Sequence, residues 1–175
     1  MFTFGCHCAE SSLARKKAAP DTGAMSTLRS QISAFCGPAD AGDFRYERET
    51  RQIRVAVKPA YLDDQSDPED DRYVWSYTVT IENTGEEPVQ LMSRYWNITD
   101  GQGRMQEMRG PGVVGAQPVI APGESFQYTS GCPLETASGY MVGRYQMMSL
   151  NSGEAFEADI PAFLLESPYE RRQIH

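Results

Sequence analysis

The sequence predicts an all-β protein folded as an antiparallel β-sandwich. The first observation is that apolar and polar residues alternate with a period of two, which is typical of half-buried strands. The alternation is clearest from Tyr73 to Asn83, where one face would carry Trp75, Tyr77, Val79 and Ile81. The second and third observations are turn residues at short intervals and the lack of a long helical period. Together they favour two packed sheets.

Further strands are expected on both sides of this one. Ile53, Val55 and Val57 alternate with their neighbours, and β-branched residues near Pro59 favour a strand over the helix that regularly spaced arginines could suggest. The other expected strands cover residues 89–99, 104–109, 125–130, 139–150 and 154–160, and Pro161 is expected to end the last.

One folded domain with a flanking segment on each side is the predicted organisation of the 175 residues. Residues 25–43 are small and polar and contain glycine and proline breakers, and residues 1–43 as a whole are expected to form a flexible extension or linker. Met25 offers a second plausible start, so residues 1–24 are interpreted as an upstream extension or as the result of a misplaced start codon. The domain is expected at 44–168 and a C-terminal tail at 169–175.

Charge and hydropathy argue against several classes of function. The chain has 16 basic and 24 acidic residues, and its net charge of −8 repels phosphate backbones, so we expect no nucleic-acid partner. Apolar runs reach only a few residues, whereas a membrane-spanning helix needs about 20, so we expect no membrane insertion. Four cysteines without a C-x-x-C pair, and no recognisable secretory signal, favour a cytoplasmic protein.

The histidine count argues against an enzyme. The two histidines, His7 and His175, lie near the termini, where a third group could not hold them as nucleophilic catalysis requires. Cys6-His7-Cys8 lacks the further ligands of a metal site. We therefore expect no catalytic residues, no metal site and no cofactor.

An acidic segment from Leu62 to Arg72 separates two predicted strands. It is interpreted as a solvated surface loop, with weak binding of a divalent ion as the alternative. Pro68 and the lack of a glycine break the EF-hand pattern. The acids are Asp63, Asp64, Asp67, Glu69, Asp70 and Asp71.

The segment from Gly110 to Gly115 matches G-x-G-x-x-G, but Pro118 follows too soon for the helix that a dinucleotide-binding loop requires. Two interpretations remain. The glycines either permit a tight turn with positive φ, with Gly112 and Gly115 as the favoured positions, or expose backbone N–H groups to a small anion. In the second case the candidate ligand-binding residues are Gly110, Gly112, Gly115, Arg94, Arg104 and Arg109.

Several blocks of the sequence are similar, in register, to the bacterial ApaG family, also called CorD. They are residues 73–83, 95–100, 109–118, 122–131, 143–147 and 156–163, and the resemblance extends over about residues 44–168. It implies a fibronectin type III-like, immunoglobulin-like antiparallel β-sandwich of about seven strands. The family is associated with cobalt resistance and magnesium efflux. Related domains in a ubiquitin-ligase adaptor and a polymerase-interacting protein resemble protein-interaction modules, and the resemblance implies no catalytic residues.

These observations favour a non-enzymatic binding module that docks an unidentified protein or senses a small anionic ligand. The alternative is a nucleotide- or pyrophosphate-binding protein that uses the glycine loop, with weak Mg²⁺-dependent phosphohydrolase activity from the acidic loop. A direct Co²⁺ or Mg²⁺ carrier is a third hypothesis, weakened by the lack of an internal histidine. A homodimer through an unpaired edge strand is also considered.

Overall fold

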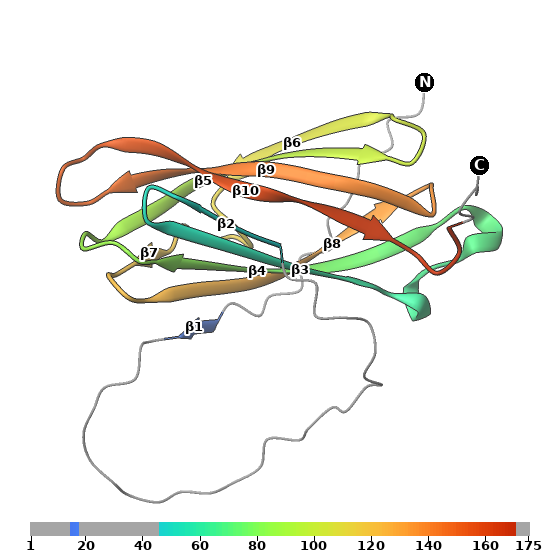
Figure 1. Cartoon of the computed structure of the whole chain (residues 1–175), viewed down its shortest axis with the longest axis horizontal. Helices are drawn as coiled ribbons and strands as arrows, with labels where there is room; N and C mark the ends of the chain where they lie inside the picture. Colours follow the sequence, from blue (N-terminus) through green and yellow to red (C-terminus); the bar gives the residue numbers. More distant parts are fainter. Residues whose placement is uncertain (1–14, 18–45, 171–175) are drawn as a thin grey trace, which may run out of the picture.

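The chain folds into two antiparallel sheets that pack face to face (Figure 1). The computed structural model describes residues 15–17 and 46–170. One sheet has the order β1-β8-β4-β3-β2, formed by Arg15–Lys17, Ser125–Leu134, Tyr73–Asn83, Ile53–Tyr61 and Tyr46–Thr50. The other has the order β10-β9-β5-β6, with β7 also paired to β5, and is formed by Ala155–Glu166, Ser138–Ser149, Val89–Asp100, Met105–Pro111 and Val119–Ile120. The predicted all-β, immunoglobulin-like sandwich is confirmed.

The core lies between the sheets, and the period-two pattern accounts for it. In β4 every second residue is buried, so the face predicted from the sequence is the inner one. Trp75 is 1% exposed, and its indole N–H donates to the Glu166 carbonyl oxygen at 3.1 Å. Trp96 of β5 packs edge-on against Phe163, with ring centroids 5.9 Å apart. Among the described residues, no helix is long and apolar enough to cross a membrane.

A pair of tyrosines forms a polar contact inside this core. The hydroxyl groups of Tyr128 in β8 and Tyr145 in β9 are hydrogen-bonded to each other across the two sheets. Burial raises the pKa of Tyr145 far above its usual range, although the bond to Tyr128 partly opposes the shift. The Tyr145 phenol therefore stays neutral, which suits a hydrogen bond without charge.

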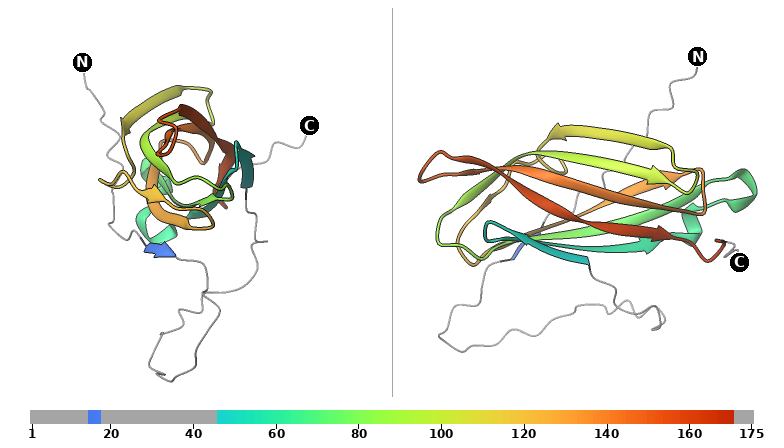
Figure 2. Two further views of the ribbon diagram at one scale, coloured as in Figure 1. Left: turned by 90° about the vertical axis from the view of Figure 1, so that its left-hand side faces the viewer. Right: turned by 45° about the horizontal axis from the view of Figure 1, so that its top comes forward.

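The two long sides of the sandwich differ. On one side β10 lies next to β2 and β3, and the backbone N–H of Asp159 donates to the Thr50 hydroxyl. Arg48 and Asp159 also form an ion pair of 3.2 Å across this side. On the other side lie β6, the last strand of its sheet, and β8, whose edge in the opposite sheet is covered by β1 over three residues only (Figure 2).

The last strand does not end at Pro161 as expected. β10 runs on to Glu166, and its pairing with β9 shifts register between Ile160 and Phe163. A proline has no N–H to donate, so an irregularity in the ladder accommodates it without a lost bond. β8 likewise continues through Pro133, beyond the three residues that β1 pairs, where the outer edge needs no donor.

Two parts of the flanking segments lie against the folded domain. Arg15–Lys17, expected within a flexible extension, forms β1 on the edge of β8, because an edge strand can pair with any extended segment. Tyr169, expected in the tail, packs against Tyr61 and donates to a carboxylate oxygen of Asp63. The other predictions for residues 1–43, including the start at Met25, and those for residues 171–175 lie outside the described residues.

Candidate functional site

The glycine loop joins β6 to β7 without a helix. Gly110 is the last residue but one of β6, while Gly112 and Gly115 have φ values of +55° and +76°. The predicted positive-φ positions are therefore confirmed. Three backbone N–H groups of the loop are already used: Gly112 donates to Met92, and Val113 and Ala116 donate to each other's carbonyl oxygens. These three N–H groups are not available to an anion.

Besides a positive φ, position 112 requires a residue without a Cβ atom for lack of space, which position 115 does not. A Cβ atom placed on Gly112 would lie 2.0 Å from the carbonyl oxygen of Ala116, whereas one placed on Gly115 would have no heavy atom within 4 Å. The chain therefore passes over itself at Gly112, where only glycine fits. This geometry favours the interpretation that the glycines shape a tight turn.

Arg94 of the neighbouring strand β5 supports the same turn. It lies on the face of β5 that also carries Trp96 and Ile98, directly across from Gly110. Its guanidinium donates to the carbonyl oxygens of Gly112 at 2.8 Å and Pro111 at 3.3 Å. Arg94 thus holds the backbone of the loop, because its guanidinium N–H groups point at carbonyl oxygens of the protein.

The other two candidate arginines lie elsewhere. Arg104 precedes β6, whereas the glycine loop follows it, so about eight residues of extended chain, roughly 25 Å, separate them. Arg109 is on the outer face of the sheet, 5.0 Å above the ring of Tyr95 and 3.3 Å from a carboxylate oxygen of Glu107. The six predicted residues therefore do not form one site, because neighbours along a strand diverge in space and alternate in face.

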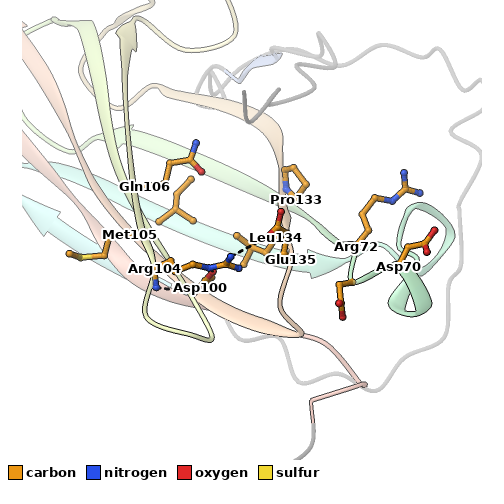
Figure 3. Close-up of a pocket in the computed structure, with 11 residues that line it drawn as sticks. Asp70, Arg72, Asp100, Arg104, Met105, Gln106, Pro133, Leu134 and Glu135 are labelled. Carbon is orange, nitrogen blue, oxygen red and sulfur yellow. Dashed lines mark hydrogen bonds and ion pairs between the residues drawn. The ribbon is translucent and has the colours of Figure 1, made fainter. Parts of the chain in front are cut away.

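A pocket of about 530 Å³ opens at the end of the sandwich where β5, β6 and β8 meet the acidic loop (Figure 3). This volume is in the range of small-molecule and side-chain sites. Apolar side chains of both sheets line it: Ile98, Met105, Pro133 and Leu134. The polar side chains are Asp70, Asp71, Arg72, Asp100, Arg104, Gln106 and Glu135.

Hydrogen bonds order the polar side of this pocket. Arg104 donates to Asp100 at 2.6 Å and to Glu135 at 3.1 Å (Figure 3). Burial pushes the pKa of Asp100 upward, but the backbone N–H groups of Arg104 and Gln102 and the Arg104 side chain outweigh it and hold that pKa below its usual range. Hydrogen bonding to Asp100 in turn raises the pKa of Arg104. Four acidic and two basic side chains line the pocket, so its formal charge is −2.

The acidic loop is built by its own backbone. It contains two short 3-10 turns, η1 at Asp63–Gln65 and η2 at Pro68–Asp70. Asp67 and Arg72 exchange backbone hydrogen bonds of 2.6 and 2.9 Å and close the loop between them. Within residues 15–17 and 46–170, no three His, Cys, Asp or Glu side chains are grouped to hold a metal ion.

The pocket was missed by reasoning from the sequence, because its lining comes from segments that are far apart along the chain. Part of a signal was present. The acidic loop, the Asp100 turn and the break at Pro133 are all irregular segments, and irregular segments that end neighbouring strands gather at one end of a sandwich.

Comparison with known proteins agrees with this architecture. The ApaG domain family matches residues 63–149. Protein ApaG of Brucella anthropi is 60% identical over 130 residues, covering 74% of this chain and 99% of that protein. Protein ApaG of Rhodospirillum centenum is 62% identical over 126 residues, covering 72% and 96%.

Solved structures give the same result. A Bordetella pertussis protein described as ApaA superposes with a TM-score of 0.65 and 50% identity, covering 71% of this chain and 99% of that one. These identities extend over nearly the whole length of the relatives, and the family match at residues 63–149 includes the strands that form the pocket. The chain therefore belongs to the ApaG family.

Proposed function

We propose that this protein is a non-enzymatic binding module that recognises a protein partner through the pocket at the end of β5, β6 and β8. The observation that carries the proposal is the pairing of an apolar lining with a preordered, net acidic polar side. Apolar surface supplies affinity, and a few fixed polar groups orient what binds. The non-enzymatic part of the proposal is supported by the engagement of Arg104 with Asp100 and Glu135, which ties these polar groups to one another.

The charge of the pocket points to the chemistry of the partner. A formal charge of −2 favours a partner with a basic side chain, and the apolar lining favours apolar groups beside it. Lysine or arginine, each with an apolar stem, next to leucine would meet both conditions. An anionic ligand, which the arginines suggested in the sequence, has less support, because Arg94 and Arg104 are engaged with protein oxygens.

The nucleotide hypothesis has less support for a related reason. Three N–H groups of the glycine loop are bonded within the protein, and no helix macrodipole follows the loop. We expect ATP or a diadenosine polyphosphate to bind no more tightly than about 100 µM in calorimetry. We also propose a cytoplasmic location, supported by four cysteines that include no C-x-x-C pair.

The experiment is a selection of short peptides from a random library against the full chain. We expect the selected peptides to combine basic and apolar residues. Glu135→Lys, which reverses a charge at the pocket, should weaken the best peptide at least tenfold. Glu157→Lys is the matched control, since Glu157 is also an exposed acid that pairs with one arginine, on the outer face of the other sheet. Acidic selected peptides, or equal affinity for both variants, would contradict the proposal.

A further inference from the structure

Among the described residues, strand β6 forms an open edge of its sheet. It pairs with β5 along one side, and no other strand of the described part of the chain pairs with its opposite side. Such an edge presents a row of backbone N–H and C=O groups that can bind another extended segment. The side chain of Met105 at its start is 72% exposed, so the edge is accessible along its beginning.

We propose that a second copy of this chain pairs antiparallel with β6, across a two-fold axis through Met108. Met108 is the middle residue of the seven in Met105–Pro111, so every residue of the strand finds a partner. In this register Glu107 lies directly opposite Arg109 of the second copy, and Arg109 lies opposite Glu107 of that copy. Opposite charges in directly facing positions stabilise an antiparallel pair.

Charge and strand geometry select this register over its neighbours. Directly opposite residues of an antiparallel pair lie on the same face of the sheet, so the axis must pass through a residue and not between two residues. An axis through Glu107 would set two carboxylates against each other, and one through Arg109 would set two guanidinium groups together. Directly facing like charges destabilise a strand pair.

The remaining edges are less suited to the same pairing. In β2 an axis through the middle residue, Arg48, would place Glu47 opposite Glu49 of the second copy, and β10 already lies next to this strand. In β8 the edge beyond β1 contains Pro133, which lacks an N–H for the ladder. Among these strands, β6 alone combines an open edge with a self-complementary charge pattern.

Contacts on the outer face of the sheet already hold the Arg109 side chain in position within one protomer. Arg109 and Arg144 lie over the ring of Tyr95, each 5.0 Å from its centroid, on three adjacent strands. Arg109 is further held by Glu107 at 3.3 Å within one protomer. Because the guanidinium is already positioned, less side-chain freedom is lost when Glu107 of the second copy joins it. This proposal rests on β6 and is independent of the proposed function of the pocket.

Sedimentation equilibrium of the full chain tests the proposal. We expect a species of twice the 19.5 kDa mass in a concentration series that extends to about 1 mM at low salt. Arg109→Glu should weaken association about tenfold or more, and the double variant Glu107→Arg with Arg109→Glu should restore it. Arg51→Glu is the matched control that leaves association unchanged, because Arg51 also pairs with a glutamate and lies over an aromatic ring, but it is in the turn between β2 and β3 of the other sheet.

A monomer at every concentration would overturn the proposal, as would undiminished association of folded Arg109→Glu, checked by circular dichroism. A double variant that remains as weak as the single one would overturn the register. Disulfide trapping provides a second measurement, because Met108 faces itself across the axis. Met108→Cys should cross-link on oxidation above the wild-type background, whereas Met105→Cys, which faces Pro111 of the second copy, should not. Equal cross-linking of both variants would also overturn the register.

Discussion

Substitution of Gly112 by alanine separates the two interpretations of the glycine loop. If the loop only shapes a turn, Gly112→Ala should destabilise the fold strongly, because the new Cβ would lie 2.0 Å from the carbonyl oxygen of Ala116. Backbone must move to relieve that contact. The carbonyl oxygens nearby accept hydrogen bonds from Val113 and Arg94, so the movement disturbs both.

The expected cost follows from these contributions. A non-glycine residue in the left-handed region costs roughly 1–2 kcal/mol. Weakening two hydrogen bonds adds about 0.5–1.5 kcal/mol each. Gly112→Ala should therefore reduce the free energy of unfolding by about 2–5 kcal/mol. Gly115→Ala, with φ of +76° and open space around its Cβ, should lose only about 1–2 kcal/mol.

Urea denaturation followed by tryptophan fluorescence measures both values, since Trp75 and Trp96 are buried and change environment on unfolding. Gly110→Ala is an internal control, because Gly110 does not have positive φ and its Cβ would make only ordinary contact with Arg94. We expect the order of destabilisation Gly110, Gly115, Gly112. Equal stability of the Gly112 and Gly115 variants would refute the steric argument.

Three further predictions concern the core and the Asp100 turn. Trp75→Ala should cost about 3–5 kcal/mol in denaturant titrations, because the whole side chain is buried. A double-mutant cycle of Tyr128→Phe and Tyr145→Phe should give a coupling free energy of about 1 kcal/mol, and additive losses would contradict the hydrogen bond across the sheets. The folded pKa of Asp100 is depressed, so its contribution is present above the unfolded pKa, about 3.9, and is lost as pH falls through the lower folded value. Asp100→Asn should therefore be less stable than wild type at pH 7 and should lose less stability than wild type between pH 5 and pH 2 in thermal melts.

The fold could be predicted largely from local pattern, because burial in a sandwich repeats every second residue. The faces of β4 follow directly from the positions of Trp75 and Tyr77. The ends of strands were harder to predict. Whether Pro161 ends β10 depends on which way its missing N–H would have pointed and on a register shift in the partner strand. Neither the direction of that N–H group nor the register shift can be predicted from the neighbouring residues of the sequence.

The site was harder to predict because closeness in sequence is a poor guide to closeness in space in β-structure. Arg104 and Arg109 are five residues apart, yet Arg104 comes just before the first residue of β6 and Arg109 lies near its last. Glu135 is 31 residues from Arg104 but forms an ion pair with it, because the end of β8 returns to the same end of the sandwich. The pocket depends on contacts of this second kind, which only the pairing of strands determines.

The glycine motif shows why a pattern of residues can be interpreted correctly in conformation and still leave function open. A phosphate-binding loop and a tight turn between strands both require positive φ, so both select glycine at Gly112 and Gly115. The difference lies in the direction of the N–H groups. Here the backbone N–H groups of Gly112 and Val113 donate to protein carbonyl oxygens. The guanidinium of Arg94 donates to the Gly112 carbonyl oxygen of the turn and not to an external anion. Because backbone direction is set by pairing with Met92 and Ala116, which lie outside the three glycines, the G-x-G-x-x-G spacing alone could not distinguish the two uses.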